Sequence, residues 1–400
     1  MASGLSFSAA ASALGYLYQV RYGLVLLLEA KNPASALSLE KIDDVAFEES
    51  GDPTQVLQFK HRLARTATLT DSSVDLWKTL RVWATKIAGG DLDPTSTILS
   101  FVTTAIAPEN SAAALLRRDS NRNETAALIK LREAGSRSEN KTVVTAFEAF
   151  DALSPEAQER LVSSIVVLDS AADIERARQL LEKALFYSTR PEFLVPLCDR
   201  LEGWWFRWAI AHLRDPQAIP SISLAEVRYR LADLQEQFRL DNLPVDFPIE
   251  QDLDESDLQP DERMFVEQLR LVLVGHQRIK RAISDYWRAF EQRSKWVREE
   301  LIVDVDLEQY EDRLIREWQE LFLIMKEKLT EASDHAVEGR ELYNRVVIEG
   351  NHIPIRPAFP NPYVMRGGFH ILANALKVGW HPLFKKRLSK TLEIAATAAK

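Results

Sequence analysis

The stretch Ile42-Asp43-Asp44-Val45-Ala46-Phe47, followed after a turn at 49–53 by Val56-Leu57-Gln58-Phe59-Lys60, decides the fold of the N-terminal half. Both segments are rich in β-branched and aromatic residues, which predicts two strands joined as a hairpin. Because side chains alternate across a strand, Gln58 and Lys60 point to one face. Leu57 and Phe59 point to the other face, into a core. The side chains of Gln58 and Lys60 therefore lie together on one face of the strand.

The elements on either side of this hairpin predict an α/β domain. Apolar residues at helical spacing predict a helix from about Ser8 to Glu29, which Asn32-Pro33 ends. A second helix begins near 70–72, and β-branched runs at 97–103 and 164–168 predict two further strands. Helices thus alternate with strands, which is typical of a mixed sheet covered by helices.

Length and composition indicate a multidomain globular protein. The chain has 400 residues, of which 46% are apolar and 27% charged, so we expect two domains with sizeable cores. A single cysteine, Cys198, excludes an intramolecular disulfide framework and fits a reducing compartment. No apolar run approaches the ~20 residues that a membrane helix needs. We therefore expect a cytoplasmic protein with no membrane partner.

The net charge of −9 belongs largely to one segment. Eight acids and no Lys or Arg lie between Asp246 and Glu262, so the rest of the chain has a net charge of −1. Pro248 and Pro260 lie in the same segment and Pro244 lies just before it, which is typical of a solvated connection. The sequence therefore predicts an N-terminal domain over 1–240, an acidic linker over 241–262 and a C-terminal domain over 263–400.

The C-terminal part has a purely helical pattern. Apolar spacing predicts one long helix from Asp261 to about Leu301 and a second from about Leu307 to Leu329. Two such helices with a short connection predict a long helical hairpin. Prolines exclude a helix over 353–362, and the aromatic residues that follow predict a docked tail.

Several catalytic classes lack their motifs. The sequence has no phosphate-binding Gly-x-x-x-x-Gly-Lys-Ser/Thr loop and no dinucleotide-binding Gly-x-Gly-x-x-Gly turn. It has no Gly-x-Ser-x-Gly elbow, and its seven histidines show no His-x-x-x-His spacing. The polar residues of the hairpin remain as the best candidates for chemistry.

These residues carry a resemblance to PD-(D/E)xK nucleases. An acid on one strand, followed 10 to 20 residues later by an acid or Gln, any residue and Lys, is the arrangement of that class, and Asp44 precedes Gln58 by fourteen residues. Gly15-Tyr16-Leu17-Tyr18-Gln19 and Leu69-Thr70-Asp71 add to the likeness. The tail, with Arg366-Gly367-Gly368-Phe369-His370 and Val378-Gly379-Trp380-His381-Pro382, resembles the C-terminal domain of ABC-three-component effectors. The combination is similar to the nuclease subunit of Lamassu antiphage defence, although residues from about 105 to 260 match no motif.

The resemblance implies a restriction-endonuclease-like mixed sheet and a site formed by Asp44, Gln58 and Lys60. Asp44 and Gln58 would bind Mg²⁺ or Mn²⁺, and the ion would polarise the scissile phosphate and acidify a water molecule. Gln58 replaces an acid that many relatives have, and so contributes an oxygen but no charge. Asp43, Glu29 and Gln19 are possible supporting residues, with the choice between Asp43 and Asp44 as ligand left open. His61, Arg62 and Arg65 form a basic cluster suited to DNA phosphates.

The resemblance also implies partners. It predicts an endonuclease that cuts double-stranded DNA, is held inactive by an SMC-like ABC ATPase and a small middle subunit, and acts after release. Because each chain carries one set of catalytic residues, cutting both strands predicts self-association into a homo-oligomer. The alternative is a non-catalytic adaptor that uses the helical half to bind partners.

Overall fold

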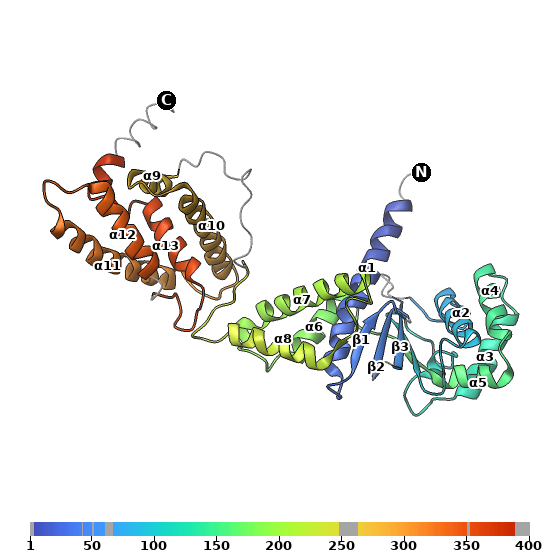
Figure 1. Ribbon diagram of the computed structural model, residues 1–400. Helices are drawn as coiled ribbons and strands as arrows, with labels where there is room; N and C mark the ends of the chain where they lie inside the picture. The colour runs from blue at the N-terminus through green and yellow to red at the C-terminus, as the bar shows by residue number, and fades with distance from the viewer. Residues whose placement is uncertain are drawn as a thin grey trace. The chain divides into compact units, whose positions relative to one another are not determined.

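The computed structural model describes residues 4–41, 43–49, 52–60, 67–247, 263–349 and 353–388. The chain divides into two compact units, Met1–Asp233 and Leu234–Lys400. The first is a mixed sheet flanked by helices and the second is mainly helical (Figure 1). This confirms the predicted fold class.

The first unit begins with a helix and a three-stranded meander and continues with helices among which three further strands occur. Its elements are α1 (Gly4–Glu29), β1 (Ala36–Leu39), β2 (Val45–Glu49), β3 (Asp52–Lys60), α2 (Val74–Gly89), β4 (Ile98–Thr103), the 3₁₀ turn η1 (Ala114–Leu116), α3 (Glu124–Ser136), α4 (Lys141–Asp151), α5 (Pro155–Ser164), β5 (Ile165–Leu168), α6 (Ile174–Ala184), η2 (Pro191–Phe193), α7 (Leu194–Arg214), β6 (Ile222–Ser223) and α8 (Leu224–Gln237).

The sheet has the order β5-β4-β3-β2-β1-β6. Strands β1, β2 and β3 pair antiparallel, whereas β3, β4 and β5 pair parallel. The four predicted strands are present as β2, β3, β4 and β5. Strand β1, which the sequence analysis did not predict, extends the sheet beyond β2 and pairs at its other side with β6.

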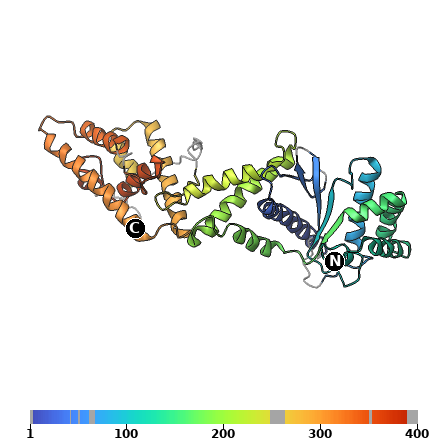
Figure 2. The same ribbon diagram turned by 90° about the horizontal axis from the view of Figure 1, so that it is seen from below.

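Helices cover both faces of the sheet, as Figure 2 also shows. On one face the ring of Phe59 packs against Tyr18 and Tyr22 of α1, each with ring centres 5.7 Å apart. On the other face Val56 belongs to a core built with α2, α3, α4 and α5, which includes the buried Trp83. The predicted inward direction of Phe59 is therefore confirmed, and Gln58 and Lys60 share the face of Val56 because side chains alternate.

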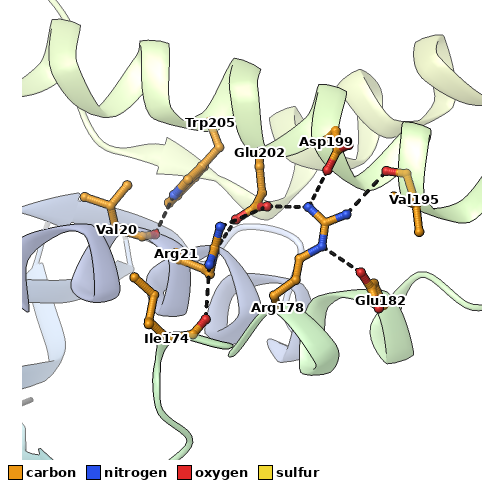
Figure 3. A network of polar contacts seen from close by, with 9 residues as sticks. All are labelled: Val20, Arg21, Ile174, Arg178, Glu182, Val195, Asp199, Glu202 and Trp205. Atoms are coloured by element: carbon orange, nitrogen blue, oxygen red, sulfur yellow. Dashed lines mark hydrogen bonds and ion pairs between the residues drawn. The ribbon is translucent and has the colours of Figure 1, made fainter. Parts of the chain in front are cut away.

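A buried ion network fixes α1 to α6 and α7 (Figure 3). Glu202 of α7, whose side chain is only 8% exposed, accepts a hydrogen bond from Arg21 Nε at 2.5 Å. Its second oxygen accepts one from Arg178 Nη1 at 2.6 Å. Arg178 also contacts Glu182 and Asp199, at 2.7 and 2.6 Å. Helix α1 is therefore joined through one carboxylate to α6 and α7, which are distant from it in the sequence.

The second unit consists of α9 (Met264–Leu271), α10 (His276–Arg298), α11 (Asp304–Lys328), α12 (His335–Glu349) and α13 (Pro362–Asn374). The two predicted long helices are present as α10 and α11, and an ion pair of 2.5 Å between Arg293 and Glu311 joins them. Helix α13 packs closely on α10. A Cβ added to Gly367 would lie 2.1 Å from the carbonyl oxygen of Asp285, so this approach requires glycine.

The predicted single helix from Asp261 to Leu301 is wrong, because α9 and α10 are separate helices. The chain turns at Leu273, whose φ of 54° lies in the left-handed region. The amide of Val274 donates to the carbonyl of Leu269 and closes α9. Val272 and Val274 are buried on either side of this turn. Their side chains continue the apolar spacing across the break, which explains why the sequence pattern did not predict it.

The predicted docking of the tail is confirmed, since Tyr363, Phe369 and Trp380 are buried. The start of the predicted linker also packs on the second unit. The indole of Trp296 donates to the carbonyl of Pro244, and Lys295 pairs with Asp246 at 2.7 Å. The rest of the linker, 248–262, lies outside the described residues. Over the described ranges, no helix has the length and apolar character needed to cross a membrane.

Substitution of Glu202 by Gln should destabilise the first unit strongly. The change removes the carboxylate that pairs with Arg21 and one of the three that pair with Arg178, and loss of one partner of a buried ion pair typically costs about 3 kcal/mol or more. We expect thermal unfolding followed by calorimetry to show a lower transition temperature for this unit. Asp199→Asn is the matched control, because Asp199 binds the same Arg178 but its side chain is 58% exposed, and its loss should be below about 1 kcal/mol. Equal losses of stability for Glu202→Gln and Asp199→Asn would contradict the central role of Glu202 in the network.

Candidate active site

Asp44 is anchored at the point where the ladder between β2 and β3 ends. The last ladder pair on this side is Val45 with Leu57. One residue beyond, Oδ2 of Asp44 accepts a hydrogen bond from the main-chain N–H of Phe59 at 2.7 Å. The carboxylate therefore takes the place of a main-chain acceptor and lies beside β3 between Gln58 and Lys60.

Gln58 and Lys60 lie on the face of β3 that α2 covers. The Gln58 side chain is 6% exposed and forms no hydrogen bond with any described residue. Lys60 pairs with Thr103 at the end of β4, and the Thr103 hydroxyl donates to the carbonyl of Lys60 at 3.1 Å. The three predicted catalytic residues are therefore brought together at one end of the sheet.

Asp43 has a different environment from Asp44. Its Oδ2 accepts a hydrogen bond from the indole Nε1 of Trp83 at 2.7 Å, and its Oδ1 accepts one from the main-chain N–H of Asp44 at 3.1 Å. Both oxygens of Asp43 are thus occupied by protein donors. For Asp44, only Oδ2 has a donor among the described residues. This difference favours Asp44 as the ligand and Asp43 as its support.

The carboxylates influence one another electrostatically. Burial, and to a lesser extent the charge of Asp44, together raise the pKa of Asp43 to about 6, although the hydrogen bond from Trp83 lowers it. A crowded set of acids at the end of a sheet is the arrangement that a bound cation would relieve. The charge of Asp44 therefore acts on both Asp43 and Glu40.

Glu40 is a member of this group that the sequence analysis missed. It follows β1, its N–H donates to the carbonyl of Asp44, and its φ of 53° is unusual for a residue other than glycine. Partial burial raises the pKa of Glu40, and the charges of Asp44 and Asp43 raise it further. The positive charges of Lys60 and Lys86 oppose this rise. The only sequence signal for Glu40 was its place after a strand that was itself not predicted.

Two of the predicted supporting residues form no hydrogen bond with Asp44. Glu29 ends α1 and is exposed. Three residues later Asn32 donates to Glu49, which is the last residue of β2, whereas Asp44 precedes the first. At about 3.3 Å per residue, Glu29 therefore lies near the opposite end of the strand, roughly 15 Å away. Gln19 is half-buried on α1, and within the described part of the chain no hydrogen bond ties it to the site.

The predicted DNA-binding residues His61, Arg62 and Arg65 lie outside the described residues, directly after β3. Lys86, one turn after Trp83 on α2, is a basic residue near the carboxylates that the sequence analysis did not select. The described residues contain no group of three or more His, Cys, Asp or Glu side chains arranged to hold a metal ion. The protein oxygens available are those of Asp44 and Gln58, with Glu40 and Asp43 nearby.

The raised pKa of Asp43 predicts a pH dependence of stability in metal-free buffer. Asp43 binds its proton more tightly in the folded protein than in the unfolded chain, so its contribution to stability is fully present below pH ~4 and is lost as the pH rises through about 6. The free energy of unfolding of the wild type minus that of Asp43→Asn should fall by on the order of 2 kcal/mol over this range. Urea unfolding with a chelator present measures this difference in the free energy of unfolding. A difference that grows with pH would contradict a raised pKa of Asp43.

One comparison with known protein families gives a match, which lies in the second unit. A search of curated proteins found no match to the chain. Residues 265–388, which include α9 to α13, match the family model of C-terminal domain 7 of the ABC-three component (ABC-3C) systems. This match supports a protein of an ABC-three-component system, and thus a component of a multi-protein assembly.

Proposed function

We propose that the chain is the effector of an antiphage and anti-plasmid defence system of the Lamassu type, and that it is a metal-dependent DNA endonuclease. The observation that carries the proposal is the hydrogen bond of 2.7 Å between Asp44 and the N–H of Phe59. It holds a carboxylate beside Gln58 and Lys60 at one end of a sheet whose order, helix, three-stranded meander, helix and parallel strand, is that of the nuclease class the sequence resembles.

The residues present fit a magnesium or manganese ion. Mg²⁺ binds oxygen, commonly through one or two carboxylates completed by water and substrate phosphate, so a cage of three protein acids is not required. Asp44 and the amide oxygen of Gln58 would hold the ion. When bound, it would supply charge to the scissile phosphate and a more acidic water.

Lys60 supplies the positive charge that the reaction needs from the protein. It lies one strand position beyond Phe59, on the same face as Gln58, and its charge acts on Glu40. An ammonium group there can steady the attacking water or the charge that develops on the phosphate. His61, Arg62 and Arg65 follow directly in the sequence and would bind the DNA backbone.

The second unit would connect this nuclease to its partners. Its match to a C-terminal domain of ABC-three-component systems supports docking to other subunits. We infer that these are an SMC-like ABC ATPase and a small middle subunit, which hold the nuclease inactive. Release would then permit self-association, because two sites must face one duplex to cut both strands.

Substitution of Lys60 by Ala should abolish cleavage. Purified wild-type chain, freed from partners and concentrated, should cut double-stranded DNA with Mg²⁺ or Mn²⁺ and stop when a chelator is added. Removal of the ammonium group from the reacting centre should lower the rate by about 10²-fold or more. Lys78→Ala is the matched control, because Lys78 is an exposed residue of α2.

Two results would contradict the proposal in different ways. If Lys60→Ala cuts DNA as well as the wild type, the site is misassigned. If the wild type cuts no DNA even when free and concentrated, while the chain still binds partner subunits, the protein is the non-catalytic adaptor. Equal melting temperatures for both variants and the wild type would show that a loss of cleavage is not a loss of folding.

Self-association predicts that cleavage per chain rises with protein concentration. Double-strand breaks should appear with a more than linear dependence on concentration, over the range in which light scattering detects an oligomer. Nicked DNA should predominate below that range, since a single site cuts one strand. A strictly linear dependence with no oligomer would contradict activation by assembly.

A further inference from the structure

We propose that Trp83 of α2 is a positioning residue of the nuclease site, which holds Asp44 in place through Asp43. This inference rests on the proposed function and assigns a role to a residue outside its motif. Trp83 is 40 residues from Asp43 in the sequence and 1% exposed. Its indole can only donate, and its one donor is directed at the Asp43 carboxylate.

Asp43 forms a bridge between two elements. One oxygen accepts the Trp83 indole at 2.7 Å, and the other accepts the main-chain N–H of Asp44 at 3.1 Å. A carboxylate with both oxygens occupied cannot rotate without breaking one of these bonds. The bridge therefore ties the main chain of Asp44 to α2.

Asp44 is consequently held from two sides. Its N–H is fixed by Asp43, and its own carboxylate is fixed by the N–H of Phe59 at 2.7 Å. These contacts leave Oδ1 without a donor among the described residues, and so free to bind a metal ion. Groups that orient a metal ligand in this way are commonly worth 10- to 100-fold in metal affinity.

Helix α2 is itself held by the helices that follow it. Trp77, two turns before Trp83, packs edge-on against Phe147 and Phe150 of α4, with ring centres 5.8 and 6.3 Å apart. Gly135 of α3 lies so close to Trp77 that an added Cβ would be 2.8 Å from its ring. The helices α3, α4 and α5, in a region without any recognised motif, therefore brace the helix that carries Trp83.

Trp77 provides a matched control for Trp83. Both indoles are buried on α2, at 0% and 1% exposure, and both donate one hydrogen bond of 2.7 Å. The acceptor of Trp77 is the main-chain carbonyl of Asp71, in the loop before α2, and not a group of the site. Replacement of either indole by Phe removes one donor and leaves an aromatic ring in the core.

The test compares the metal affinity of Trp83→Phe and Trp77→Phe in the full chain. Titration calorimetry with Mn²⁺ alone should show binding weakened 10- to 100-fold by Trp83→Phe and less than 3-fold by Trp77→Phe. Both variants should lose thermal stability to a similar extent. Cleavage at subsaturating Mn²⁺ should fall in parallel with affinity, and saturating Mn²⁺ should restore most of it.

Other outcomes separate this inference from the proposed function. If the wild type binds Mn²⁺ and cuts DNA, and both Phe variants bind Mn²⁺ as tightly as the wild type, Trp83 is structural only and the inference is overturned. If the wild type neither binds Mn²⁺ nor cuts DNA, the proposed function fails and the inference fails with it. Should Trp83→Phe not fold, Asp43→Asn interrupts the same bridge and must weaken Mn²⁺ binding by at least 10-fold.

Discussion

The buried carboxylate of Glu202 is the constraint on which the packing of helices in the first unit depends. Removing a carboxylate from water costs several kcal/mol unless charged donors replace the water, and Arg21 and Arg178 do so from α1 and α6. These hydrogen bonds hold α1 against α7. From that position Tyr18 and Tyr22 pack on Phe59, so the ion network fixes the strand whose main chain binds Asp44.

The crowding of acids at the end of the sheet gives a physical reason for Gln58. The charge of Asp44 already raises the pKa of Asp43, and the charges of both raise the pKa of Glu40. A fourth carboxylate at a position that is 6% exposed would add desolvation and repulsion. An amide provides an oxygen ligand without either. The departure from the acid found in many nucleases of this class is therefore consistent with a site that has extra acids nearby.

The sequence was sufficient wherever the pattern was local. Alternation predicted which side of β3 carries Gln58 and Lys60, and apolar spacing predicted α1, α10 and α11 as helices. The sequence was insufficient where a residue's role depends on a partner that is distant in the sequence. It was also insufficient where the apolar pattern continues through the end of a helix. Glu40 depends on the four-residue strand β1, which is too short for a period of two to be recognised. The turn between α9 and α10 lies inside an unbroken apolar pattern, so only tertiary packing reveals it.

Packing gives a structural role to a region of the sequence that contains no recognised motif. Residues from about 105 to 240 resemble no nuclease signature, yet α3 and α4 pack on α2, α5 packs on α3, and α6 and α7 bind α1 through Arg178 and Glu202. Catalytic motifs are short because the reacting atoms are few, whereas the atoms that hold them must come from the whole fold. A buried indole 40 residues from its acceptor, and a guanidinium 181 residues from its carboxylate, have no local signature. The support of the site is therefore encoded in core packing, where a search for motifs cannot find it.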